Sequence, residues 1–230
     1  MPQPPSPATS SAASSAWMLT LWQRTWRLWW LKTLGTTAFM MGFFTIYLHV
    51  LKHPAYPVIS MPLTVVDHMV PFQAASLPLY LSLWVYVSLP MAPIHTWTRL
   101  VRFGLAMGGL CLAGLVCFFF WPTAVPLLDV DWSAHAGFAQ LHAIDSAGNA
   151  CPSLHVAAAV CAAGWLHHQL VELGAGRAVR FGNLLWCAGI VYSTLATKQH
   201  VSLDVLAGTA LGLLTVFLSL PRRTVLAKAE

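Results

Sequence analysis

Long apolar runs, separated by short polar stretches, recur along this 230-residue chain. A membrane-spanning helix needs about 20 mostly apolar residues. Six runs approach that length, near Thr33–Val50, Val70–Leu89, Gly104–Trp121, His155–Leu170, Phe181–Thr197 and Leu203–Leu220. Several contain Gly, Ser or Thr, which is typical of helices that pack together in lipid. One run alone could be the buried helix of a soluble core, but six in succession predict an all-α bundle of six transmembrane helices.

The amino-terminal segment has a different pattern. Pro2 to Ala16 are almost entirely Pro, Ser, Ala, Thr and Gln, which predicts a disordered tail over residues 1–16. Residues 17–230 are then predicted to form a single membrane-embedded domain. Five Trp residues between positions 17 and 30 cluster with Arg24, Arg27 and Lys32. They indicate either an interfacial segment before the first span or an extension of the first helix.

Composition supports a membrane environment. Hydrophobic residues make up 57% of the chain and Asp, Glu, Lys and Arg only 8%, whereas an ordinary soluble domain carries roughly 25% charged residues. The chain is too apolar to be disordered over most of its length. Twelve basic against seven acidic residues are too few to indicate a nucleic-acid-binding surface. The bilayer is therefore the expected partner, and no nucleic acid is expected.

The positions of the basic residues predict an orientation, because Lys and Arg favour the cytoplasmic side of short loops. With both termini in the cytoplasm, only Lys52 and Lys198 lie on the outer side. The other ten basic residues lie inside: Arg24, Arg27, Lys32, Arg99, Arg102, Arg177, Arg180, Arg222, Arg223 and Lys228. Most His residues and the long loop from Pro122 to Pro152 fall outside. Any chemistry is thus expected at the outer (periplasmic or extracellular) face of the cytoplasmic membrane.

Two polar clusters border the apolar runs, and the first is the stretch from Asn149 to His155. Pro152 suits the first turn of a helix, which would leave Ser153 and His155 beside unpaired backbone N–H groups. Such a helix start is an anion site that commonly binds phosphate. The alternative is an ordinary helix start, with Ser153 as a cap and His155 at the membrane interface. Asn149 is either a head-group ligand or a solvated loop residue.

The second cluster extends from Ser193 to Asp204. His200 and Asp204 are four residues apart and would share one helix face. A carboxylate bonded to one imidazole nitrogen fixes the tautomer and strengthens the other nitrogen as base or nucleophile. Lys198 could supply positive charge to a phosphoryl transition state. The alternative is a His–Asp pair that only fastens a helix end.

The two clusters together resemble the type 2 phosphatidic acid phosphatase superfamily. The resemblance lies in Pro152-Ser153-Leu154-His155, followed by Ser193, His200 after six residues and Asp204 after three more. It implies that His200 forms a phosphohistidine, that Asp204 orients it and that His155 protonates the leaving oxygen. It also implies phosphate contacts from Ser153 and Ser193, and a mechanism without a metal or another cofactor. Consistently, no Cys pair has metal-ligand spacing and the histidines are scattered.

The sequence departs from the superfamily pattern at several positions. The Lys…Arg-Pro motif is absent, since counting from Lys52 puts Ile59 at the Arg position; Thr194 stands at another Arg position and Leu154 at a Gly position. These departures make the chain more similar to the branch that contains inositol phosphorylceramide synthases, as does the stretch Asp67-His68-Met69-Val70-Pro71-Phe72. That branch can pass a phosphoryl head group from one lipid to another. Lys198 is the candidate for part of the missing charge.

The sequence therefore predicts a lipid phosphate phosphatase in the membrane. Its expected substrates are a phospholipid, a polyprenyl phosphate or a sphingolipid-type lipid. A head-group phosphotransferase that uses the same site is the first alternative, and a non-catalytic lipid carrier or assembly subunit is the second. The acceptor, water or an alcohol, and the oligomeric state stay open at this point.

Overall fold

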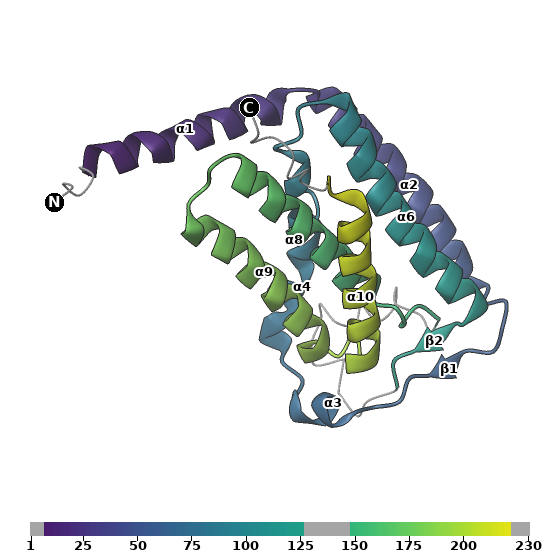
Figure 1. Ribbon diagram of the computed structural model, residues 1–230. Helices are drawn as coiled ribbons and strands as arrows, with labels where there is room; N and C mark the ends of the chain where they lie inside the picture. The colour runs from purple at the N-terminus through teal and green to yellow at the C-terminus, as the bar shows by residue number, and fades with distance from the viewer. Residues whose placement is uncertain (1–6, 127–147, 222–230) are drawn as a thin grey trace, which may run out of the picture.

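The computed structural model describes residues 7–126 and 148–221 (Figure 1). The long helices in these ranges are α1 (Pro7–Trp26), α2 (Trp29–Lys52), α6 (Trp97–Phe120), α8 (Leu154–Glu172), α9 (Arg177–Ala196) and α10 (Ser202–Ser219). The short helices are α3 (Val65–Met69), η1 (Ala74–Ser76), α4 (Leu77–Leu81), α5 (Leu83–Tyr86) and η2 (Leu89–Met91). Strands β1 (Ile59–Ser60) and β2 (Thr123–Ala124) pair in parallel.

Helix α8 lies at the centre of the bundle. It packs most extensively against α10 and α9, while α2 lies along α6 and α4 lies against α9 (Figure 1). The residues of α8 that face these neighbours are small, among them Ala157, Ala159 and Ala162, all fully buried. Small residues let helix backbones approach closely, so α8 can be enclosed by other helices.

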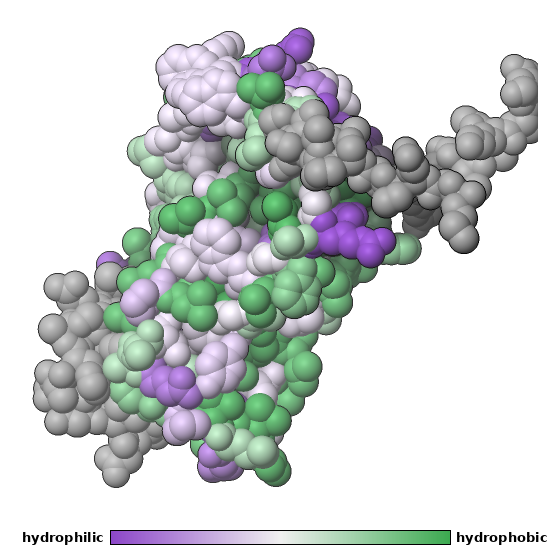
Figure 2. Space-filling view, turned by 90° about the vertical axis from the view of Figure 1, so that its left-hand side faces the viewer, coloured by the Kyte–Doolittle hydropathy of each residue, from purple (hydrophilic) through white to green (hydrophobic). Residues whose placement is uncertain are grey.

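Four described segments are long and apolar enough to cross a membrane: Trp29–Lys52, Ala74–Met91, Trp97–Phe120 and Ser202–Ser219. Large apolar side chains on their outward faces are exposed, with Leu105 and Leu218 each at 71%. Figure 2 shows a face that is mostly green and white, with the hydrophilic residues in small separate patches. This is the surface expected of helices that face lipid.

The predicted spans near His155–Leu170 and Phe181–Thr197 form helices α8 and α9 but are not among these four segments. Helix α8 carries His155, His167, His168, Gln169 and Glu172 along with its alanines, which lowers its hydropathy. Its environment consists largely of other helices, so it needs fewer large apolar side chains. The prediction of six spans is therefore supported for four segments, and the predicted location of both chain ends falls on residues outside the described ranges.

The predicted span near Val70–Leu89 is helical only from Ala74 onward. Val70 is extended, because a residue that precedes Pro, here Pro71, is disfavoured in the helical region. From there the backbone runs through η1, α4, α5 and η2, with the junction residues Ser76 and Ser82 still in helical conformation. The predicted span is therefore present as Ala74–Met91, although Pro and Ser residues divide it into short helical pieces.

Helix α1 begins at Pro7, inside the segment predicted to be a disordered tail. Pro suits a first helical turn and the Ala residues that follow favour helix. Between α1 and α2, Leu28 adopts a left-handed conformation with φ 59°, and α1 turns away from the bundle axis (Figure 1). The Trp-rich segment is therefore divided between two helices: Trp17, Trp22 and Trp26 lie in α1, whereas Trp29 and Trp30 begin α2.

Glycines bring α10 against the start of α8. A Cβ added at Gly208 would lie 2.4 Å from the carbonyl oxygen of Ser153, and one at Gly212 would lie 2.7 Å from that of Ala157. Ser153 in turn donates its N–H to the Asp204 carbonyl, at 3.0 Å. This close approach holds the first turn of α10 beside the first turn of α8.

We expect Gly208→Ala to lower the free energy of unfolding by about 1–3 kcal/mol, because the added methyl group forces the two helices apart. Thermal unfolding of the detergent-solubilised protein measures the change. Gly182→Ala in α9 is the matched control, since a Cβ there meets nothing within 4 Å and Ala favours helix. Equal melting temperatures for the two variants would contradict this account of the packing.

Candidate active site

One end of the bundle gathers the segments that carry both sequence clusters. The starts of α8 and α10, the end of α9, helix α3 and the two strands all lie at this end (Figure 1). The turn between α8 and α9 and the junction of α1 with α2 lie at the opposite end. Arg99, near the start of α6, also lies there and makes two hydrogen bonds to Glu172, at 2.5 and 3.0 Å.

The first cluster begins helix α8, as predicted, but with a shifted boundary. Ser153 is the extended N-cap, and its hydroxyl accepts a hydrogen bond from the Val156 N–H, at 3.2 Å. Pro152 therefore precedes the cap and does not lie in the first turn, because the backbone becomes helical only at Leu154. The interpretation of Ser153 as a cap is confirmed, and His155 lies in the first turn.

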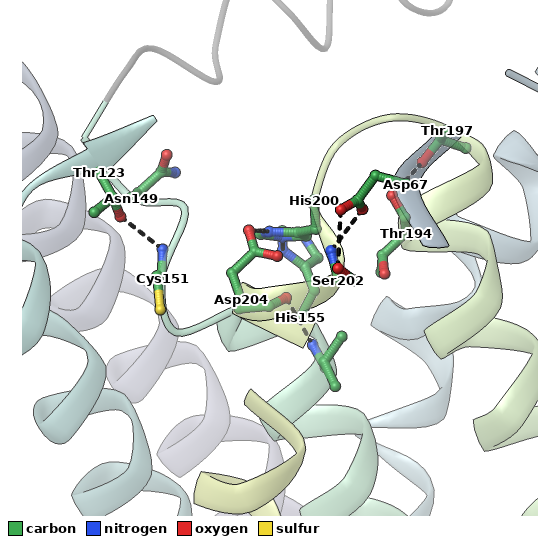
Figure 3. Close-up of polar contacts among 12 residues, drawn as sticks. Asp67, Thr123, Asn149, Cys151, His155, Thr194, Thr197, His200, Ser202 and Asp204 are labelled. Atoms are coloured by element: carbon green, nitrogen blue, oxygen red, sulfur yellow. Dashed lines mark hydrogen bonds and ion pairs between the residues drawn. The ribbon is translucent and has the colours of Figure 1, made fainter. Parts of the chain in front are cut away.

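The predicted contact between His200 and Asp204 is present. His200 Nδ1 lies 3.0 Å from Asp204 Oδ2, and the two residues are 6% and 0% exposed (Figure 3). The helix begins only at Ser202, so the turn before α10 brings His200 into place, rather than a helix face shared by both residues. The Nδ1–H of His200 donates a hydrogen bond to the Asp204 carboxylate, which places the imidazole lone pair on Nε2.

His155 lies next to His200. Its Nδ1 is 3.4 Å from His200 Nε2, and the two ring centroids are 5.5 Å apart. The two catalytic candidates thus come from different segments, His155 from the first turn of α8 and His200 from the loop before α10 (Figure 3). Asp204, His200 and His155 form a continuous row of polar groups.

Helix α3 anchors the loop that carries His200. The Asp67 carboxylate accepts hydrogen bonds from the Ser202 N–H at 2.7 Å, from the Ser202 hydroxyl at 2.9 Å and from the Thr64 N–H at 2.7 Å. Burial alone would raise the pKa of Asp67, but these hydrogen bonds outweigh it and lower the pKa below its ordinary value. Sequence reasoning had noted Asp67 only as part of a resembling stretch and assigned it no contact.

Two predicted phosphate-binding residues are engaged elsewhere. The Lys198 ammonium donates to the backbone carbonyls of Asp67 and Val70, and burial lowers the pKa of Lys198. The Ser193 hydroxyl donates to the Ile190 carbonyl within α9, at 2.7 Å. The contacts described for both side chains therefore belong to the scaffold around His200.

A cavity of about 190 Å³ opens beside the two histidines. His155, His200, Asn149, Tyr47 and Tyr80 are among its lining residues, and Asn149 donates a hydrogen bond to the Tyr47 hydroxyl. The rest of the lining is mostly apolar and includes Phe39, Phe43, Trp84 and Phe118. Phe39, Phe43 and Tyr47 recur every four residues and so share one face of α2, a pattern that could have identified this wall from the sequence.

Among residues 7–126 and 148–221, no group of three or more His, Cys, Asp or Glu side chains is arranged to hold a metal ion. The groups closest to the cavity are the two imidazoles and the Asn149 amide, with the Asp204 carboxylate bonded to His200. An imidazole with a lone pair on one nitrogen can attack an electrophile, and a second imidazole beside it can deliver a proton.

The model of the PAP2 superfamily matches residues 120–224. This part of the chain belongs to the PAP2 superfamily. The PAP2 segment contains every residue of both sequence clusters, so the resemblance carried by those clusters is confirmed at the level of the superfamily. Searches of curated proteins and of solved structures give no significant match. Membership in the synthase-like branch stays a prediction.

Proposed function

We propose that this protein is an integral membrane lipid phosphate phosphatase that works through a phosphohistidine on His200. The observation that carries the proposal is the row Asp204–His200–His155 at the polar side of an aromatic cavity. Membership of residues 120–224 in the PAP2 superfamily supports phosphatase or phosphotransferase chemistry in general. The row Asp204–His200–His155 supports the specific roles of orienting carboxylate, nucleophile and proton donor, in that order.

The proposed reaction has two displacements at phosphorus. His200 Nε2 attacks in line, an N–P bond forms and the bond from phosphorus to the leaving oxygen breaks, while His155 gives that oxygen a proton. Water then attacks the phosphohistidine, His155 takes the proton of that water, and the N–P bond breaks to release inorganic phosphate. Asp204 stabilises the positive charge that develops on His200 during the first attack. The cycle needs no metal or other cofactor.

Four residues are proposed to bind the phosphate: Ser153, Asn149, Ser193 and Lys198. Asn149 has the strongest support, because it lines the same cavity as His155 and His200. Ser153 is supported by its place at the start of α8, where the helix dipole favours an anion. The Ser193 hydroxyl would have to leave the Ile190 carbonyl, whereas Lys198 has a third N–H besides the two that bond to the Asp67 and Val70 carbonyls.

A lipid substrate fits the chemistry of the cavity. A cavity of about 150 Å³ holds a molecule the size of benzene, so the 190 Å³ measured here suits a segment of one hydrocarbon chain beside the phosphate. Phospholipids, polyprenyl phosphates and sphingolipid-type lipids all have such a chain. The protein is proposed to act at the outer face of the cytoplasmic membrane, with six spans and both termini inside. The basic residues gathered at the end opposite the histidines support this orientation.

A head-group phosphotransferase is the second candidate. The loss of the superfamily's basic residues favours it, since Ile59 and Thr194 stand at positions where Arg is expected, and so does Leu154 at a position where Gly is expected. In this reaction a lipid alcohol, and not water, would attack the phosphohistidine. A non-catalytic lipid carrier is the third candidate, favoured by the same loss of charge and opposed by the paired His200 and Asp204.

Phosphate release from purified protein tests these alternatives. The full chain in detergent–lipid micelles is offered phosphatidic acid, a polyprenyl phosphate and phosphatidylglycerol phosphate, with and without a second lipid alcohol and in the presence of a chelator. We expect inorganic phosphate from at least one lipid. Head-group transfer to the added alcohol without phosphate release would favour the transferase. If neither inorganic phosphate nor a transfer product formed, the result would support the lipid carrier and overturn the enzymatic proposal.

A further inference from the structure

Tyr80 holds the second histidine of the site from a part of the chain that lies outside the PAP2 segment. It belongs to α4 and is 2% exposed. Its hydroxyl oxygen lies 2.9 Å from His155 Nε2, and its ring stacks on the imidazole with centroids 5.0 Å apart and planes inclined by 30°. Tyr80 therefore fixes both the position and the rotation of the His155 ring.

The hydrogen bonds define which His155 nitrogen faces the reacting phosphorus. Asp204 accepts the Nδ1 proton of His200, which leaves a lone pair on His200 Nε2. His155 Nδ1 faces that lone pair at 3.4 Å, a favourable contact when Nδ1 carries a proton. His155 Nε2 is then the nitrogen bonded to the Tyr80 hydroxyl. The row of polar groups thus extends from Asp204 through both histidines to Tyr80.

We propose that Tyr80 is a positioning residue for His155, and that it makes Nδ1 the nitrogen that transfers protons to and from the substrate. The proposal rests on the phosphohistidine mechanism described above. In that mechanism, Tyr80 contacts neither the phosphate nor the leaving group. Its hydroxyl keeps Nε2 occupied and the imidazole turned so that Nδ1 points to the space beside His200 Nε2, where the phosphorus would lie.

A tyrosine hydroxyl suits this role because it both donates and accepts hydrogen bonds. When His155 is neutral with its proton on Nδ1, the Tyr80 O–H donates to Nε2. When His155 is protonated, the Nε2–H donates to the Tyr80 oxygen and the Nδ1 proton moves to the leaving oxygen as its bond to phosphorus breaks. Neutral His155 then keeps the Nε2 proton, and Nδ1 accepts the proton of the attacking water. Tyr80 remains neutral throughout, so every proton is accounted for.

Tyr80→Phe tests the proposal, because Phe keeps the stacked ring and removes the hydroxyl. We compare kcat/KM for a lipid alkyl phosphate with kcat/KM for an aryl phosphate, whose phenolate leaves with little need of a proton. For each substrate, kcat/KM reports only the steps up to release of the leaving group, so hydrolysis of the phosphohistidine does not affect it. We expect a loss of about 10- to 100-fold for the alkyl phosphate and less than about threefold for the aryl phosphate, as for an impaired general acid.

Tyr86→Phe is the matched control. Tyr86 is also a buried tyrosine of this segment, but its hydroxyl donates to Asn183, at 2.7 Å from Oδ1. Any loss of activity in Tyr86→Phe should be equal for the two substrates, and the melting temperatures of both variants are measured alongside. An equal loss for the two substrates in Tyr80→Phe, or no loss, would overturn the positioning role. Phosphate release that persists in His200→Ala would instead overturn the proposed function itself.

Discussion

His200→Ala is expected to reduce phosphate release by at least about a thousandfold, because it removes the atom proposed to attack phosphorus and leaves only binding and electrostatic contributions. The side chain is 6% exposed and its Nδ1 is already paired with Asp204. No other described imidazole has both a carboxylate at 3.0 Å and a place in the lining of this cavity. Initial rates on the best lipid phosphate measure the change.

A trapping experiment separates loss of the nucleophile from loss of the fold. Wild-type protein mixed with radiolabelled lipid phosphate and quenched in alkali should retain the label as phosphohistidine, which His200→Ala should not. His53→Ala is the control, since His53 is exposed just beyond the end of α2 and should keep its rate within about twofold, as surface substitutions usually do. An active His200→Ala variant, or one that is still labelled, would refute the assignment.

The parts of the site that the sequence could predict are the local ones. The spacing of His200 and Asp204 and the position of Ser153 before an apolar run depend on residues within one turn of each other. Both predictions are present in the structure as a 3.0 Å contact and as an N-cap. Even here the helix boundaries were displaced, because Pro152 and His200 both precede the first helical residue.

The contacts that support these groups come from distant parts of the chain. Tyr80 is 75 residues from His155, Tyr47 is 102 residues from Asn149, and Asp67 is 135 residues from Ser202. Hydrophobic periodicity predicts that a helix exists, but it does not say which helices become neighbours or how they are rotated. Such pairings follow from tertiary packing, and a single sequence contains no direct signal for them.

Charge alone was a poor guide to the position of Lys198. Lys198 is one of only two basic residues assigned to the outer side, which suggested a phosphate ligand, yet its ammonium contacts the backbone carbonyls of Asp67 in α3 and of Val70 just after it. A lysine has three N–H donors on a long side chain, and carbonyls left free at the end of a short helix are good acceptors. In the same way, apolar composition indicated a bundle but could not show that α8 would be enclosed by its neighbours.

Asp204→Asn is the substitution with the second largest expected effect, about 10²- to 10⁴-fold in kcat, because the change is nearly isosteric and yet disturbs the tautomer of His200. If the Asn amide nitrogen faces His200 Nδ1, the imidazole must carry its proton on Nε2, and the attacking lone pair is lost. If the amide oxygen faces Nδ1, the tautomer survives, but the negative charge that would stabilise the imidazolium is gone.

The surroundings of Asp204 make the second orientation costly as well. Its other oxygen, Oδ1, is buried and has no hydrogen-bond partner among the residues that the structure describes. An amide nitrogen placed there would bury two donors without acceptors, at a cost of about 1–3 kcal/mol. The variant should therefore lose stability as well as rate, and thermal unfolding alongside kcat distinguishes the two effects.

Asp67→Asn is the matched control, since Asp67 is another buried carboxylate at the same end of the bundle but bonds to Ser202 and Thr64 rather than to a histidine. It should lower the melting temperature while costing less than about tenfold in kcat, because it removes an anchor and not the proton acceptor of His200. If the two variants lost equal activity, Asp204 would be a structural anchor as well, and the negative charge beside His200 would have no special part in the reaction.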